Sequence, residues 1–241
     1  MAGLTLSSAL KRTIDVVVSC AATAVLAPLL VAIAIAIVLD SRGGVFFRST
    51  RIGRGGHPFT MLKFRTMVSD PDGGGPPVTA RNDLRVTRVG RVLRRTKLDE
   101  LPNLVNVLRG EMSLVGPRPE TPALVDAFDP LRSRVCSVLP GMTGLVQLRF
   151  PNEEAMLAET DLGNPAYAAH VRHKLELDGL YVERASLMRD LSILLCTAMA
   201  MLGVAVDLTS LFGPEARLRP AADRARDTDP DGRLPEVVGE N

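Results

Sequence analysis

A nearly unbroken apolar run near the N-terminus constrains the fold of this chain more than any other feature. It extends from Ile14 to Leu39 and is long enough to cross a bilayer as a helix. Pro28 stands inside the run, where a proline removes a backbone hydrogen bond and bends a helix. Basic residues flank both ends, and the positive-inside rule places both on the cytoplasmic side. These features favour a re-entrant helix that turns near Pro28 over a spanning helix, although both topologies remain open.

The rest of the chain has the pattern of a small mixed domain. A glycine-rich turn at 53–56 separates two predicted short strands, and a loop is expected at 70–77. The final predicted helix has an apolar face that would pack in the core or lie at the membrane surface. Strands are predicted at 45–47 and 59–64, and helices at 84–95, 98–108, 124–139, 171–182 and 187–202.

Two adjacent carboxylates, Asp99 and Glu100, follow an arginine-rich segment and precede a proline-braced loop. Adjacent acids repel each other, so the pair is unfavourable unless a metal or cations offset its charge. A site for phosphates needs this mixture, because an acid attacks or holds a metal while arginines hold oxyanions. The alternative is that both acids simply occupy the first turn of a helix, where the helix dipole favours negative charge.

Positive charge is concentrated before this acidic pair. Lys63 and Arg65 alternate along a predicted strand and would point to one face. Nucleic-acid binding is disfavoured because the net charge is +2 and the chain has no Trp and two Tyr. Two interpretations remain. The basic residues form a solvated face, or they bind anionic lipid head groups or a phosphorylated substrate, and the neighbouring apolar run favours the second interpretation. The densest cationic segment contains Arg81, Arg85, Arg88, Arg91, Arg94, Arg95 and Lys97.

Taken in order, these motifs resemble the bacterial sugar transferase family, the small monotopic polyprenyl-phosphate phosphoglycosyl transferases. The resemblance covers residues 10–203. Each motif is short, but their joint order and spacing are specific. The motifs are the apolar run with Pro28, FFR at 46–48, KFRTM at 63–67, RVGRVLR at 88–94, LDELP at 98–102, NVLRGEMSLVGPRP at 106–119 and PGMTG at 140–144.

The resemblance implies a membrane-associated α+β fold. Residues 1–42 would form a re-entrant membrane helix, broken at Pro28. Residues 43–205 would form a small mixed catalytic domain with interfacial amphipathic helices, on the cytoplasmic face of the bacterial inner membrane. Residues 213–241, rich in Pro, Arg and Asp, read as a disordered tail.

The resemblance also implies a reaction. Such enzymes transfer a sugar-1-phosphate from a UDP-sugar to a polyprenyl phosphate, usually undecaprenyl phosphate, release UMP and use Mg²⁺. They begin the assembly of exopolysaccharides and other glycoconjugates. By the motif match, Asp99 would be the nucleophile and lie at the metal, and Glu100 would assist as a base. Substrate contacts would come from Arg94, Arg118, Pro117 and Pro119, with Lys63 and Arg65 as weaker candidates.

Two departures from the family pattern leave the acidic pair intact. No Trp follows Gly144, and Leu180 precedes Tyr181 where many members have paired tyrosines. Both departures lie in the region expected to determine which sugar is transferred, so the sequence does not identify the sugar. It does not identify the oligomeric state either. The alternatives to an enzyme are an inactive membrane scaffold for glycan assembly and a basic protein that binds a membrane surface or nucleic acid.

Overall fold

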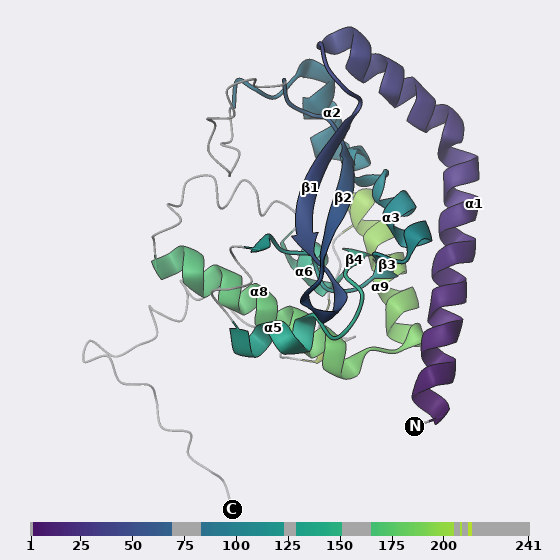
Figure 1. Ribbon diagram of the computed structural model, residues 1–241, viewed down its shortest axis with the longest axis vertical. Coiled ribbons are helices and arrows are strands. Elements are labelled where there is room, and N and C mark those ends of the chain that lie inside the picture. The colour runs from purple at the N-terminus through teal and green to yellow at the C-terminus, as the bar shows by residue number, and fades with distance from the viewer. Residues whose placement is uncertain are drawn as a thin grey trace, which may run out of the picture.

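A long helix, α1 (Ala2–Asp40), runs along one side of a body of shorter helices and strands (Figure 1). The structure is a computed structural model that describes residues 2–68, 83–122, 129–150, 165–204, 208 and 212–213. The predicted loop at 70–77 and the predicted tail beyond Gly213 lie outside the described residues.

The helix α1 matches the apolar run. Within the part of the chain that the structure describes, it is the one helix long and apolar enough to cross a membrane. The sequence predicted a break at Pro28, but the residues on both sides of this proline stay helical. Figure 1 shows instead a continuous helix that bends in its second half, as expected when an interior proline removes one backbone hydrogen bond. Much of the helix surface is apolar and exposed, including Val25 and Leu39.

The N-terminal half of α1 is fixed to the body by polar side chains. Arg12 donates hydrogen bonds to the carbonyl oxygens of Val107 (2.6 Å) and Leu108 (3.0 Å). These carbonyls belong to the last turn of a helix, where they have no partner within the helix itself. Asp15 is buried and accepts a hydrogen bond from the backbone N–H of Leu114 (3.1 Å).

The C-terminal end of α1 is fixed to the same body. The Arg65 guanidinium donates to the carbonyl oxygens of Ser41 (2.8 Å) and Arg42 (2.5 Å), directly after the helix. Asp40 accepts the backbone N–H of Val89 (2.9 Å) and so caps the start of the next helix. Both ends of the apolar helix therefore contact one folded unit.

Two small sheets support the body. Strands β1 (Phe46–Ile52) and β2 (Pro58–Phe64) form an antiparallel hairpin, with Phe46 opposite Phe64 and Ile52 opposite Pro58. Strands β3 (Ser113–Val115) and β4 (Gly141–Thr143) are parallel. The predicted strand at 59–64 is confirmed, and the predicted strand at 45–47 extends further, to Ile52.

The predicted helices occur in the predicted order with changed boundaries, and the short helix α6 was not predicted. The predicted helix at 84–95 begins later because Thr87 caps it by accepting the N–H of Gly90 (2.9 Å). The predicted helix at 98–108 divides at Pro102 into a 3-10 turn, Leu98–Glu100, and an α-helix. The described helices after α1 are α2 (Arg88–Thr96), α3 (Asn103–Arg109), α5 (Asp129–Val135), α6 (Leu145–Arg149), α8 (Pro165–Arg184) and α9 (Leu187–Met201).

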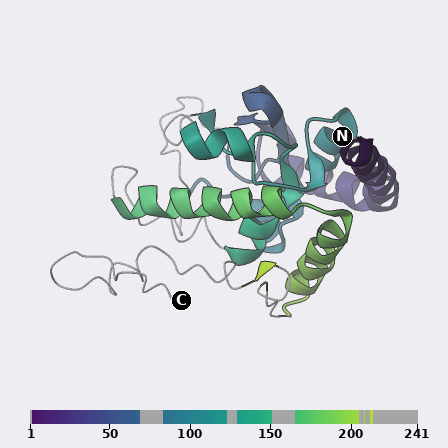
Figure 2. The same cartoon turned by 90° about the horizontal axis from the view of Figure 1, so that it is seen from below.

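The main core lies between the parallel strands and the helices α3, α6, α8 and α9. Figure 2 shows α8 running across the body, with α9 turning away from its end. A smaller core joins α1 to α2 and β2 through Ile37, Leu93 and Phe64. There the backbones approach so closely that a Cβ on Gly90 would lie 2.0 Å from the Thr66 carbonyl oxygen. The main core includes Val107, Met112, Val115, Val146, Leu177, Tyr181 and Ile193.

Candidate active site

The acidic pair lies in the tight connection between α2 and α3. Lys97 ends α2 in the left-handed conformation (φ 58°), which non-glycine residues adopt uncommonly. The chain therefore reverses sharply and enters the 3-10 turn that contains Asp99 and Glu100. Asp99 is only 9% exposed, so this carboxylate lies largely out of water.

Cations surround Glu100. Lys63 Nζ, on β2, lies 2.7 Å from Glu100 Oε1, and Arg118 Nη2 lies 3.7 Å from the same oxygen. Burial by itself raises the pKa of Glu100, but the charges of Lys63 and Arg118 outweigh it and bring the pKa to about 2. Glu100 is consequently a carboxylate at neutral pH, in agreement with the expectation that cations offset the repulsion within the pair.

A buried asparagine fixes the distance between Lys63 and the acidic pair. Asn106, on α3, donates from Nδ2 to the Thr60 carbonyl oxygen (2.7 Å) and accepts the Leu62 N–H through Oδ1 (3.1 Å). It thereby binds α3 to the backbone of β2, which is the strand that carries Lys63. Sequence reasoning did not find Asn106, although a polar residue among the apolar residues of a helix was a signal that could have done so.

The predicted substrate residues fall into separate groups. Lys63 and Arg118 gather at Glu100, whereas the Arg65 guanidinium holds the carbonyls after α1. Arg94 donates from Nε to Thr66 Oγ1 (2.9 Å), at the junction of α2 with the segment after β2. The prediction that Lys63 and Arg65 share a face fails because β2 ends at Phe64, between them.

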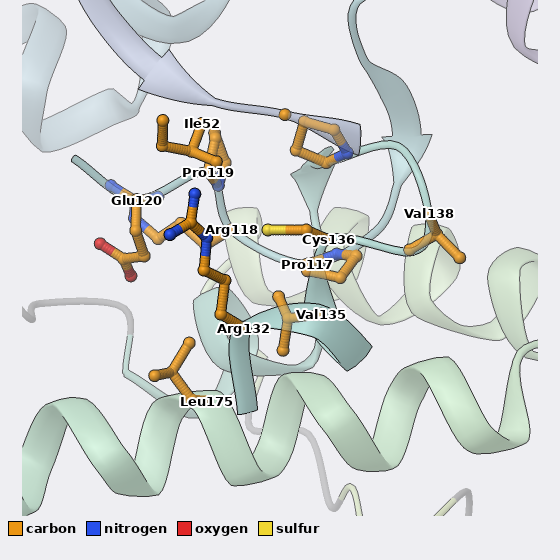
Figure 3. A pocket seen from close by; sticks show the side chains of 12 residues that line it. Ile52, Pro117, Arg118, Pro119, Glu120, Arg132, Val135, Cys136, Val138 and Leu175 are labelled. Carbon is orange, nitrogen blue, oxygen red and sulfur yellow. The ribbon is translucent and has the colours of Figure 1, made fainter. Parts of the chain in front are cut away.

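Pro117 and Pro119 line a pocket together with Arg118, and neither Asp99 nor Glu100 belongs to its lining (Figure 3). The pocket lies between the end of β1, the loop that carries Arg118, and the helices α5 and α8. Arg132 extends from α5 toward this loop. The two prolines and Arg118 thus form one continuous wall, as their grouping in the sequence suggested.

Two charged residues of α8 lie behind the same loop, and sequence reasoning missed both. Lys174 and Asp178 are 4% and 1% exposed, which is rare for charged side chains. Their spacing of four residues, within a run that also contains the buried Leu175 and Leu177, was the available signal.

The described residues contain no group of three or more His, Cys, Asp or Glu side chains placed to hold a metal ion. Mg²⁺ commonly uses only one or two protein carboxylates and takes its other ligands from substrate phosphates and water. Asp99 provides a hard carboxylate oxygen of the kind that Mg²⁺ prefers, whereas Glu100 is already paired with Lys63 and Arg118, so Asp99 would be the ligand that this pair offers to such an ion.

Known proteins similar to this chain are named as sugar-phosphate transferases or as exopolysaccharide production proteins. A relative from Caulobacter vibrioides, named UDP-glucose:undecaprenyl-phosphate glucose-1-phosphate transferase, is 44% identical over 195 residues, covering 80% of this chain and 69% of the relative. The exopolysaccharide production protein PSS of Rhizobium leguminosarum bv. phaseoli is 40% identical over 200 residues, covering 80% and 95%.

A third relative is much longer than this chain. The UDP-N-acetylgalactosamine-undecaprenyl-phosphate N-acetylgalactosaminephosphotransferase of Aeromonas hydrophila is 37% identical over 196 residues, which cover 80% of this chain and 44% of that protein. The family model described as bacterial sugar transferase matches residues 6–204, which include all but the first four residues of α1, the acidic pair and α9. The chain belongs to the bacterial sugar transferase family.

Proposed function

We propose that this protein transfers a sugar-1-phosphate from a UDP-sugar to undecaprenyl phosphate in the bacterial inner membrane and releases UMP. This reaction would begin the assembly of an exopolysaccharide or a related glycoconjugate. The observation that carries the proposal is the buried Asp99 next to a Glu100 that Lys63 and Arg118 keep ionised. The names of the relatives specify the same donor and acceptor classes.

In the first chemical step, an Asp99 carboxylate oxygen attacks the β-phosphorus of the donor. A bond forms between this oxygen and phosphorus, and the bond from phosphorus to the bridging oxygen breaks, so that UMP leaves with the bonding electrons. In the second step, an undecaprenyl phosphate oxygen attacks the same phosphorus. Asp99 is released as a carboxylate, and the product is undecaprenyl diphosphate-sugar.

The surrounding residues explain why a carboxylate is competent here. A carboxylate is a weak nucleophile in water, and burial removes part of its hydration while nearby cations reduce the charge of the attacked phosphate. Glu100 would accept the proton of an incoming acceptor phosphate, and for this the charges of Lys63 and Arg118 would have to be drawn from Glu100 to the substrate phosphates. Mg²⁺ at Asp99 would supply charge neutralisation for the diphosphate.

We further propose that α1 is re-entrant and that both of its ends lie on the cytoplasmic side. Support comes from the contacts of Arg12 and Asp15 at one end, and of Asp40 at the other, with a single folded body. A straight spanning helix would carry one of these ends across the bilayer and break its contacts. The bend in the second half of the helix is consistent with a return to the same leaflet (Figure 1).

Cysteine labelling tests this topology. In a variant without the native cysteines, Ser8→Cys and Gly44→Cys place one thiol at each end of the apolar stretch. We expect a membrane-impermeant maleimide to label neither thiol in spheroplasts and both in inverted membrane vesicles. Full labelling after permeabilisation serves as the control. Labelling of one position in spheroplasts and the other in inverted vesicles would identify a spanning helix.

The proposed reaction is tested by UMP release from the purified chain in detergent, with Mg²⁺, undecaprenyl phosphate and a panel of UDP-sugars. The relatives make UDP-glucose and UDP-N-acetylgalactosamine the first donors to include. We expect release that depends on both the lipid and the metal. Absence of release with every donor would favour the alternative of an inactive membrane scaffold.

A further inference from the structure

Three polar side chains on one face of α8 contact the segment 115–120, which contains Arg118. They are spaced by four and three residues, so they follow one another along the helix. The Tyr181 hydroxyl lies 3.2 Å from the Val115 carbonyl oxygen, the Arg118 backbone N–H donates to Asp178 Oδ2 (3.2 Å), and Lys174 Nζ lies 2.6 Å from Glu120 Oε1.

These contacts are buried, so they have a high energetic cost unless each group is satisfied. Lys174, Asp178 and Tyr181 are all at most 4% exposed. Removing one partner of such a pair leaves the other buried without compensation, and the segment would then shift to reach water. These three residues of α8 therefore contribute to the position of the loop, together with its backbone hydrogen bonds to the strand β4.

The contact to Asp178 has a special role because of the residues that flank Arg118. Proline has no backbone N–H, so neither Pro117 nor Pro119 can donate a hydrogen bond. The N–H of Arg118 is the one backbone donor within this tripeptide, and Asp178 accepts it. Without Asp178, the one backbone N–H of the tripeptide would lose its acceptor, and no backbone donor would hold the tripeptide to the body.

The Arg118 side chain extends from this tripeptide toward the acidic pair, where its guanidinium lies 3.7 Å from Glu100. We propose that Asp178 and Lys174 are positioning residues, which hold the loop so that Arg118 meets the diphosphate of the sugar donor. This inference rests on the proposed function, because it assigns the donor as the molecule that Arg118 contacts. Neither residue touches the reacting atoms.

Substitutions of Asp178 separate positioning from simple stabilisation. We expect Asp178→Ala to raise the KM for the UDP-sugar at least about tenfold, with a smaller change in kcat, because a displaced Arg118 weakens donor binding. Asp178→Asn should restore the KM to within about threefold of the native value, since an amide oxygen can still accept the Arg118 N–H. The direct readout is the Kd of UDP, measured by isothermal titration calorimetry without the lipid acceptor, and it should follow the KM.

A matched control is available in α1. Asp15 is also buried and also accepts a backbone N–H, that of Leu114, four residues before Arg118. Asp15→Ala should lower the melting temperature about as much as Asp178→Ala but leave the KM for the donor within about twofold of the native value.

The outcomes are distinct. An Asp178→Ala variant with an unchanged donor KM and UDP Kd, in an active native enzyme, would overturn the positioning role alone. Equal increases in KM for Asp15→Ala and Asp178→Ala would also overturn it, because both would then act through stability. Absence of UMP release from the native chain with every donor would instead contradict the proposed function.

Discussion

Asp99→Asn is expected to reduce UMP release at least about 1,000-fold, because it removes the proposed nucleophile without changing the shape of the side chain. The amide has no carboxylate charge, so it cannot form the acyl phosphate. Asp99 lies in a 3-10 turn formed by backbone hydrogen bonds, and the substitution preserves that turn. We therefore expect the variant to fold like the native chain and to have an unchanged thermal melt by circular dichroism.

The covalent step can be observed directly. After incubation with a donor labelled at the β-phosphate and without lipid acceptor, the native chain should retain the label after denaturation, and Asp99→Asn should not. Glu100→Gln should lower turnover yet still retain label, because the glutamate is assigned to the second step. Retained activity in Asp99→Asn would contradict the covalent mechanism.

An acid-to-amide change nearby provides the control for Asp99→Asn. Asp83 lies shortly before α2, and its carboxylate is bound by the Arg85 guanidinium at 2.6 Å. Asp83→Asn should therefore leave UMP release within about twofold of the native rate. An equal loss of activity in both variants would indicate that a general loss of negative charge, and not the loss of a nucleophile, explains the effect.

Local sequence patterns predicted the elements of this fold well. The apolar run and the strand at 59–64 both follow from spacing and hydrophobicity. These patterns are local, so they are visible in a single sequence. The division of the helix at 98–108 was also encoded locally, by Pro102, but helical periodicity concealed it.

Long-range contacts were not predictable in the same way. Arg65 was a weaker candidate for substrate contact by the motif match, and in the structure its side chain holds the carbonyl oxygens that follow α1. Asn106 and Asp178 act on backbone groups that are 44 and 60 residues away in the sequence. Nothing in their neighbours identifies those partners, because the partners are brought near by the packing of whole helices.

Gly141→Ala is expected to lower the free energy of unfolding by about 3 kcal/mol or more and to leave little folded protein. The segment that contains Gly116 and the segment that contains Gly141 pack backbone against backbone at the parallel strands β3 and β4. A Cβ on Gly141 would lie 2.1 Å from the backbone nitrogen of Gly116 and 2.5 Å from the Thr143 carbonyl oxygen. Backbone atoms cannot rotate away as a flexible side chain does, so the strands would have to separate.

The same contact links this stability effect to the active site. Gly141 donates its N–H to the Pro117 carbonyl oxygen (2.8 Å), so strand separation would displace the loop that carries Arg118. Gly44→Ala is the matched control, because a Cβ there would meet no atom within 4 Å. Thermal melts followed by circular dichroism, with size-exclusion chromatography in detergent, should show native behaviour for Gly44→Ala and loss of folded protein for Gly141→Ala. A Gly141→Ala variant that melts like the native chain but no longer binds UDP would show that this glycine serves the donor directly and not the pairing of the strands.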